Sequence, residues 1–193
     1  MGGHVKLKLH FENIKTIYSK EEIVNNLDSI IEAIVSFYSD LPVDYFFQTP
    51  ADGGWSPEKN IRHLIKSTQP IHLGLVSPKV ALLLFGSVKE KSRTMSEIKS
   101  AYLAKIEAGG GAGIFTPIRE NTTPDQTIQQ KLIQDFIKLF GKYKKQISAW
   151  SEEDMDKYKM PHPLLGNLTV REMILFSIYH LFHHTEKVEH RFS

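Results

Sequence analysis

Apolar side chains recur every three or four residues along four long stretches of the chain, which is the spacing of one buried helix face. In the first stretch, Ser19 and Glu22 have the spacing of a capping box and predict a helix over about residues 20–39. Its apolar face would consist of Ile23, Leu27, Ile30, Ile31, Ile34 and Phe37. In the second stretch, Ser56 followed by Pro57 predicts a helix over about residues 57–76. Its apolar face would consist of Ile61, Leu64, Ile65, Thr68 and Leu75.

The same spacing predicts two more long helices in the C-terminal half of the chain. Thr123 and Pro124, with Gln126, predict the start of the third helix. Its apolar face would consist of Ile128, Leu132, Phe136, Leu139, Tyr143, Ile147 and Trp150. Thr169 and Glu172 form a further capping box and predict a last helix that runs to about residue 190. Its inward face would consist of Met173, Ile174, Ser177, Ile178, Leu181 and Val188.

Two shorter helices are predicted between the second and third long ones. The first begins at Ser77-Pro78 and runs to about residue 85, and the second begins at the capping box of Thr94 and Glu97 and ends near residue 108. The chain has no strong strand signal. We therefore predict an all-α fold, an antiparallel four-helix bundle with an extra short helical insertion between the second and third main helices.

The length of 193 residues fits a single helical-bundle domain over residues 1–193. Residues 1–18 are expected to be poorly ordered or to form a short N-terminal extension. The connections over residues 40–55 and 85–123 are long, and such connections are often functional or partly structured. The glycine-rich run Gly109–Gly113 lacks the Lys-Ser/Thr pair of a phosphate-binding loop, so we expect a flexible connection there.

Composition narrows the possible functions. The chain has 24 basic and 22 acidic side chains and a formal charge of +2, which gives no basic footprint of a nucleic-acid binder. It has no apolar run of about 18–20 residues and no signal-peptide pattern, so we expect a cytoplasmic protein without a membrane span. The absence of cysteine excludes disulfides, thiolate ligands and cysteine nucleophiles, so any metal would be held by imidazole, carboxylate or water.

Four of the nine histidines lie in the last predicted helix. His180 and His184 are spaced i, i+4 on the inward stripe, so both can point toward one ion. His183 falls on a flank that we expect to be wetter. The protease motif H-E-x-x-H is not met, because Leu181 stands where the general-base glutamate would be. Alternatively, one of these two histidines is a core residue whose ring nitrogens are hydrogen-bonded within the protein, and the other is solvated near the helix end.

A third ligand would come from a facing helix. His63 is the best placed residue of the second helix, and His72 is the alternative. Trp55 is a candidate for the mouth of the site, although a tryptophan in this position more often packs against its own loop. Arg62 and Lys66 could bind an anionic substrate or could simply be solvated. Candidate partners for the free ring N–H groups of the histidines are Asp28, Glu32 and Asn60.

Two segments resemble the DinB/YfiT-like superfamily. Residues 54–64, GWSPEKNIRHL, are similar to the segment that opens the second helix in that superfamily. Residues 168–173, LTVREM, and residues 180–184, HLFHH, are similar to its closing helix. The resemblance implies one divalent metal ion, nickel or zinc, on His63, His180 and His184. Many members continue with Arg-Gly-Gln where this chain has Thr185-Glu186-Lys187, which puts in doubt any contact that the glutamine would make.

Three neutral imidazoles on a divalent ion leave coordination positions for water or substrate. Such an ion lowers the pKa of a coordinated water toward about 7 or holds a thiol as its thiolate. The resemblance also implies a possible homodimer, and thiol transfer with a low-molecular-weight thiol such as bacillithiol or mycothiol. We therefore predict a metal-dependent transferase or hydrolase that acts on a small molecule. The alternative is a non-catalytic metal-binding or interaction bundle.

Overall fold

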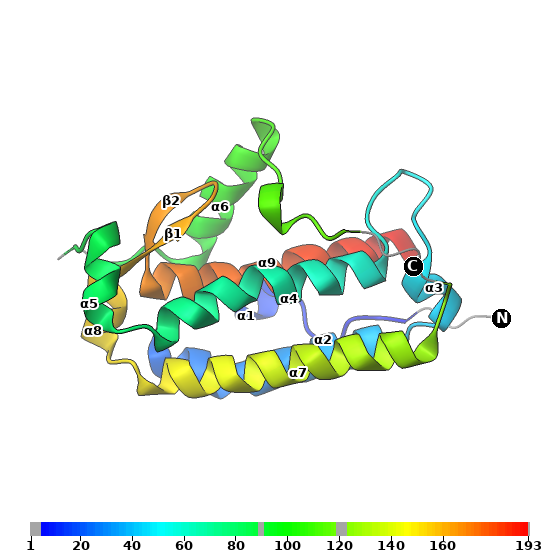
Figure 1. Cartoon of the computed structure of the whole chain (residues 1–193), viewed down its shortest axis with the longest axis horizontal. Helices are drawn as coiled ribbons and strands as arrows, with labels where there is room; N and C mark the ends of the chain where they lie inside the picture. The colour runs from blue at the N-terminus through cyan, green and yellow to red at the C-terminus, as the bar shows by residue number, and fades with distance from the viewer. Residues whose placement is uncertain (1–4, 89–90, 119–122, 193) are drawn as a thin grey trace.

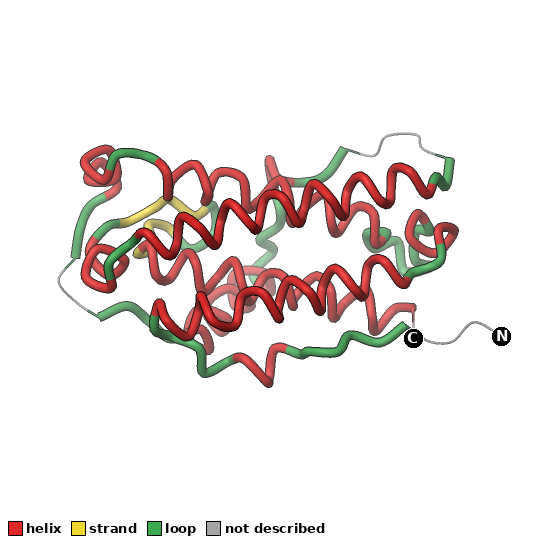
Figure 2. Tube along the Cα trace, turned by 90° about the horizontal axis from the view of Figure 1, so that it is seen from below, coloured by secondary structure: helices red, strands yellow, loops and turns green. Residues whose placement is uncertain are grey.

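The computed structural model describes residues 5–88, 91–118 and 123–192, and four long helices dominate it (Figure 1). These helices are α2 (Lys20–Asp40), α4 (Pro57–Val76), α7 (Gln126–Ala149) and α9 (Val170–Phe192). All four lie along the long axis of the molecule, as the view from below also shows (Figure 2). The predicted all-α four-helix bundle is therefore confirmed.

The four long helices run in two opposite directions. α2 and α9 run one way and α4 and α7 run the other way (Figure 1). α4 lies against both α7 and α9, and α2 lies against α7. The neighbours α4 and α7 are parallel because the connection over residues 77–125 returns the chain to the end where α4 begins. Bundles with a long crossover connection have this arrangement.

The connection contains the predicted helical insertion. Its elements are α5 (Lys79–Leu82), η1 (Leu83–Phe85), α6 (Met95–Glu107) and η2 (Gly113–Phe115). The remaining short helices of the described chain are α1 (Phe11–Ile14), α3 (Val43–Phe47) and α8 (Glu152–Lys157). No helix among the described residues combines the length and the apolar character needed to cross a bilayer.

The capping boxes explain where several helices begin. Ser19 accepts a hydrogen bond from the Glu22 amide, and the Glu22 carboxylate accepts one from the Ser19 amide at 2.8 Å. Thr94 makes the equivalent pair of bonds at the start of α6. The third long helix begins differently from the prediction, because its N-cap is Asp125 and not Thr123. The Asp125 carboxylate accepts from the Thr127 amide at 2.7 Å and so satisfies a free first-turn donor.

A two-stranded hairpin precedes α9, where no strand was predicted from the sequence. β1 (Lys159–His162) pairs antiparallel with β2 (Gly166–Thr169), with His162 opposite Gly166. Each strand has only four residues, which is too short for an alternation of apolar and polar positions to stand out. Thr169 ends β2 and also caps α9, because its hydroxyl accepts from the Glu172 amide at 3.1 Å. The hairpin and α9 are therefore fixed to each other.

Residues 5–18 pack along α9. Leu7 and Phe11 are buried, and their amides donate to the carboxylates of Glu189 and Glu186 at 2.8 Å. Residues 1–4 of the predicted N-terminal extension lie outside the described residues.

Arg171 joins the beginning of α9 to the surrounding elements. Its side chain is only 2% exposed, and Nε donates to Asp156 Oδ1 of α8 at 2.6 Å. The guanidinium also donates to the Tyr18 carbonyl at 3.0 Å and to the Glu152 carbonyl at 3.1 Å, and it pairs with the Glu152 carboxylate. A buried arginine with all of these partners fixes the direction of α9 and hence of the histidines on it.

Candidate metal centre

Three histidines from two helices meet in the interior of the bundle. His63 comes from α4, and His180 and His184 come from α9. The Nε2 atom of His180 lies 3.2 Å from that of His63 and 3.0 Å from that of His184. One ligand atom from each residue lies within 4.8 Å of the other two, and all three side chains are buried. We call these three residues the histidine cluster.

The structure brings together the three histidines that the sequence analysis selected. The alternative, His72, is half-buried further along α4 and is not among them. His183 also lies outside the cluster, because Lys187 Nζ donates to its Nε2 at 2.9 Å and Tyr179 lies 3.1 Å from its Nδ1. The flank that was expected to be wetter is largely buried, since Phe176 and Tyr179 pack against Tyr102 of α6.

Hydrogen bonds on the far side of two rings fix their tautomers. His63 Nδ1 lies 2.9 Å from the carbonyl oxygen of Phe115, which can only accept, so Nδ1 carries the proton. His184 Nδ1 lies 2.7 Å from Asn60 Oδ1. The Asn60 amide is itself oriented, because its Nδ2 donates to the carbonyls of Trp55 and Ser56. Nε2 of His63 and Nε2 of His184 are therefore unprotonated, and their lone pairs face Nε2 of His180 within the cluster.

Burial keeps these imidazoles neutral. It lowers the pKa of His180 and His184 well below the usual value near 6.5, and the neighbouring histidines add to the effect. Burial also lowers the pKa of His63, although its hydrogen bond to Phe115 acts in the opposite direction. Neutral imidazole is the form that binds metal, so no proton has to leave the cluster at neutral pH before an ion enters.

Of the three candidate partners for the free ring N–H groups, only Asn60 contacts the cluster. Asp28 lies on α2, where it is exposed and pairs with Lys144 of α7. Glu32 is also exposed on α2. Both predictions were wrong because α2 packs against α7, away from the gap between α4 and α9. The carbonyl of Phe115 was missed, because every residue carries a carbonyl group and side-chain type gives no signal for it.

Aromatic rings enclose the cluster on two sides. Trp55 stacks on His184 with ring centroids 5.8 Å apart and lies 5.0 Å from His63, so it contacts the site as well as its own loop. Tyr102 of α6 packs edge-on against His180 at 6.1 Å. Tyr102 was not predicted from the sequence, because nothing in its spacing relates it to the histidines. Burial raises its pKa, so the phenol stays protonated at neutral pH.

The two charged candidates on α4 already have partners. Arg62 pairs with Glu58 one turn earlier in the same helix. Lys66 donates to the carbonyl of Thr116 at 3.3 Å and so ties the end of η2 to α4. Neither contact places a cation at the centre of the cluster. Lys66 instead helps to hold the segment that supplies the Phe115 carbonyl.

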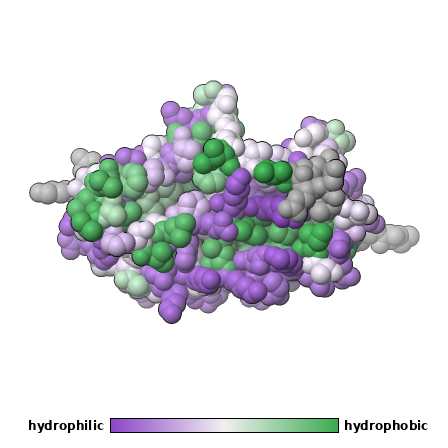
Figure 3. Space-filling view, viewed as in Figure 1, coloured by the Kyte–Doolittle hydropathy of each residue, from purple (hydrophilic) through white to green (hydrophobic). Residues whose placement is uncertain are grey.

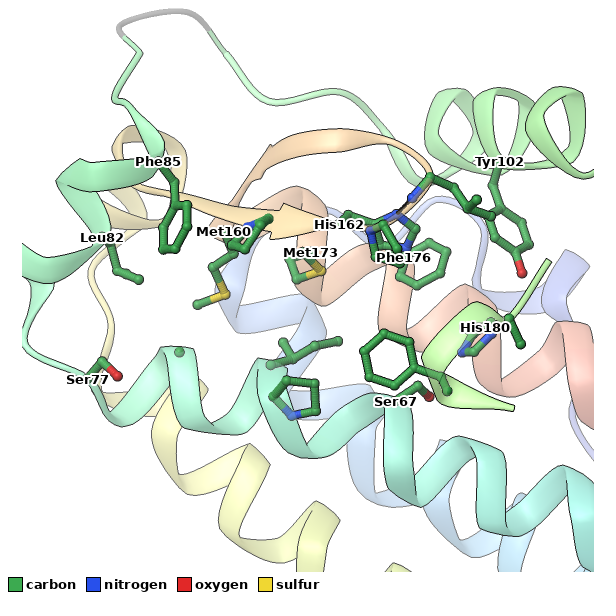
Figure 4. Close-up of a pocket in the computed structure, with 18 of the residues that line it drawn as sticks. Ser67, Ser77, Leu82, Phe85, Tyr102, Met160, His162, Met173, Phe176 and His180 are labelled. Atoms are coloured by element: carbon green, nitrogen blue, oxygen red, sulfur yellow. Dashed lines mark hydrogen bonds between the residues drawn. The ribbon is translucent and has the colours of Figure 1, made fainter. Parts of the chain in front are cut away.

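Two cavities meet at the histidine cluster. The larger one has a volume of about 520 Å³, and its wall includes His63, His180 and mostly apolar side chains (Figure 4). The smaller one has a volume of about 250 Å³, and its wall combines apolar side chains such as Trp55 and Ile106 with His63, His184, Lys187 and Arg191. We call them the apolar cavity and the polar pocket. His63 and Tyr102 line both of them.

The donor set fits a divalent transition metal ion. Two oriented lone pairs and a third neutral imidazole converge on one point, and two of the rings are held by hydrogen-bond acceptors. Imidazole suits nickel and zinc better than the hard ions calcium and magnesium, which prefer oxygen ligands. The adjoining cavities leave room for further ligands.

Residues 26–188 match the sequence model of the DinB superfamily. The match includes α4, α7 and all three histidines of the cluster. No curated protein and no solved structure matches the chain. Since the match covers more than half of its length, the chain belongs to the DinB superfamily.

Proposed function

We propose that His63, His180 and His184 hold one divalent metal ion, nickel or zinc, and that the protein is a metal-dependent transferase for a low-molecular-weight thiol. Three neutral nitrogen ligands leave coordination positions for a substrate, as in catalytic rather than structural zinc sites. A bound divalent ion supplies positive charge that favours the deprotonated form of a thiol.

The observation that carries this proposal is the meeting of two chemically different cavities at the histidine cluster. Hydrolysis needs one organic substrate and water, whereas transfer needs two organic substrates side by side. The polar pocket suits an anionic thiol, because Lys187 and Arg191 lie in its wall, where Arg191 also pairs with Asp52 at 2.9 Å and Lys187 donates to His183. The apolar cavity suits the molecule that accepts the sulfur. A transfer reaction would therefore use both the apolar cavity and the polar pocket, whereas hydrolysis would use only one of them.

The residues of the chain have separate tasks in this reaction. Lys187 and Arg191 attract the thiol, and the apolar walls exclude water from the second substrate. Tyr102 lines both cavities and, being protonated, can donate a hydrogen bond where the two substrates meet. In the reaction a sulfur–carbon bond forms and the bond from that carbon to its leaving group breaks. The leaving group keeps the electron pair, and the thiol proton passes to solvent.

The test is turnover by the metal-loaded full chain. A panel of low-molecular-weight thiols, including bacillithiol and mycothiol, is incubated with apolar alkyl halides, and loss of free thiol is followed. We expect consumption that requires nickel or zinc and is lost in the His180→Ala/His184→Ala double variant. His190→Ala is the matched control, because His190 is an exposed histidine of the same helix outside the cluster. Absence of metal-dependent consumption across the panel would favour a non-catalytic role.

A further inference from the structure

The apolar cavity is elongated and follows α4. Leu82, Phe85 and Ser77 lie at one end, and His180 and Ser67 lie at the other (Figure 4). Between them, side chains of the hairpin and of α9 form the opposite wall: Met160, Met173 and Phe176. Its volume of about 520 Å³ lies within the range of roughly 300–1,000 Å³ that is common for small-molecule sites. Methionine and phenylalanine give this wall an adaptable apolar surface.

The end that is remote from the histidines opens beside an apolar surface. Hydrophobic residues gather over α5 and the adjoining end of α4 (Figure 3). The large exposed side chains there are Leu73, Val76, Val80, Leu83 and Leu84, of which Leu84 also lines the cavity. Contiguous exposed apolar groups are unusual on a soluble surface and often mark binding sites. An apolar molecule can therefore approach this end along an apolar surface.

One residue in the wall of the apolar cavity carries an oriented hydrogen-bond donor. His162 of β1 accepts hydrogen bonds at Nδ1 from the amides of Leu164 and Leu165, at 3.2 and 3.0 Å. Because Nδ1 is an acceptor in both bonds, the ring proton of the neutral histidine is on Nε2. Nε2 has no hydrogen-bond partner among the described residues, and His162 lines the cavity. Its ring packs on Phe176, which stacks in turn on His180.

From these features we infer that the apolar cavity binds an elongated apolar molecule with one carbonyl-type oxygen, which accepts a hydrogen bond from His162 Nε2, and with a leaving group on carbon that the proposed transfer displaces. The apolar chain extends toward Leu82 and Phe85, and the carbonyl end lies near the histidine cluster. This inference rests on the proposed function, because it assigns the class of the second substrate. The binding of that molecule itself needs no metal, so it can be measured separately.

The probe for this site is N-phenyl-1-naphthylamine, a neutral dye whose fluorescence rises in an apolar site, displaced by 2-decanone. We expect the full chain to bind both, with or without metal. The His190→Ala variant should bind both within about twofold of wild type, because His190 is exposed and does not line the apolar cavity. Failure of the wild type to bind the dye overturns the inference and leaves the metal-site proposal standing. Binding without metal-dependent thiol consumption overturns the transfer proposal alone.

Two filling variants locate the site. Ser67→Phe occupies the end near the histidines, and Ala81→Phe occupies the remote end. Each should weaken binding of the dye and of 2-decanone at least tenfold. Ser100→Phe is the matched control, because Ser100 is exposed on α6 outside the cavity. Wild-type affinity in both filling variants would overturn the assignment of the cavity.

The donor is tested by His162→Phe, which keeps a ring and removes the N–H group. A net hydrogen bond contributes about 0.5–1.5 kcal/mol, so affinity for 2-decanone should fall about threefold to tenfold relative to affinity for the dye. Circular dichroism and the dye affinity itself report whether the variant is folded. An unchanged ratio of the two affinities would show that the ligand does not accept from His162.

Discussion

Asn60 determines which nitrogen of His184 is free. Its Oδ1 accepts from His184 Nδ1 at 2.7 Å, while its Nδ2 is held by two carbonyl groups at the start of α4. This is the arrangement that orients metal-binding histidines in general. Without a fixed acceptor at position 60, the His184 ring could turn over. The lone pair of His184 Nε2 would then have no fixed direction.

Asn60→Ala should therefore weaken binding of nickel or zinc about tenfold to 100-fold while the fold is kept. Isothermal titration of the metal-free protein measures this loss. Asn26→Ala is the matched control, because Asn26 makes a similar backbone bond, to the Glu22 carbonyl, on an exposed face of α2. Equal metal affinities for the two variants would contradict the role of Asn60.

His162 gives a pH dependence that can be measured without metal. Burial lowers its pKa to about 4, whereas the unfolded chain has a value near 6.5. Between these values the unfolded chain binds a proton that the folded chain does not. The free energy of unfolding therefore falls as the pH falls from 6.5 to 4. Above pH 6.5 His162 is neutral in both the folded and the unfolded chain, so it causes no loss of stability there.

His162→Asn should reduce the loss in free energy of unfolding between pH 6.5 and pH 4 by up to roughly 3 kcal/mol. Asparagine can accept from the same two amides in a turn but does not titrate. Urea unfolding of the metal-free protein at pH 7.0 and pH 4.5 measures the difference between variant and wild type. If the two proteins lose equal stability over this interval, His162 does not contribute in this way.

At the scale of single residues, the sequence predicted the part of the site that depends on helix periodicity. His180 and His184 follow from their i, i+4 spacing on an inward stripe, whereas His63 depended on the family resemblance. Phe115, Tyr102 and His162 reach the site through a connection, an inserted helix and a hairpin. Their positions depend on how α6 and the hairpin fold over α4 and α9, and periodicity carries no information about that.

At the scale of elements, the beginning of α9 depends on Arg171. Its buried guanidinium joins α9 to α8 and to the segment before α2. The carboxylates of Asp156 and Glu152 compensate its burial. Removal of the charge would leave Asp156 with the Ser92 hydroxyl and Glu152 with the Lys20 amide as donors, and breaking a buried pair in this way costs up to about 3–5 kcal/mol.

Arg171→Met should lower the free energy of unfolding by about that amount, measured by urea unfolding at neutral pH. Lys131→Met is the control, because Lys131 pairs with Asp135 on an exposed face of α7. Exposed pairs contribute at most about 1 kcal/mol. A loss below about 1 kcal/mol in the Arg171 variant would show that other contacts fix the beginning of α9.

The elements themselves were predicted unevenly. The start of α4 follows from Ser56 and Pro57, and the start of α2 follows from a capping box, because these signals lie next to the residues they control. The start of α7 was placed at the wrong cap because Thr123 and Asp125 are both good N-cap residues. The hairpin was missed because its stability comes from packing on α9 and η1, which a local pattern does not contain.

At the scale of the whole molecule, an ion on the histidine cluster would link α4 to α9. Binding to the folded chain alone stabilises it by about 2.7 kcal/mol when the free metal concentration is about 100 times the Kd. For a chain of this size the Tm should then rise by about 5–10 °C. Differential scanning fluorimetry with and without nickel or zinc measures the shift. A similar rise in the His180→Ala/His184→Ala variant would place the stabilising metal elsewhere.

The metal content of the purified full chain tests the three-histidine site most directly. The protein is loaded with nickel or zinc, desalted and analysed by inductively coupled plasma mass spectrometry beside the His180→Ala/His184→Ala and His190→Ala variants. The three-histidine site predicts about one ion per chain in the wild type and in His190→Ala, and no more than trace metal in the double variant. Trace metal in the loaded wild type, or a full complement in the double variant, would contradict it.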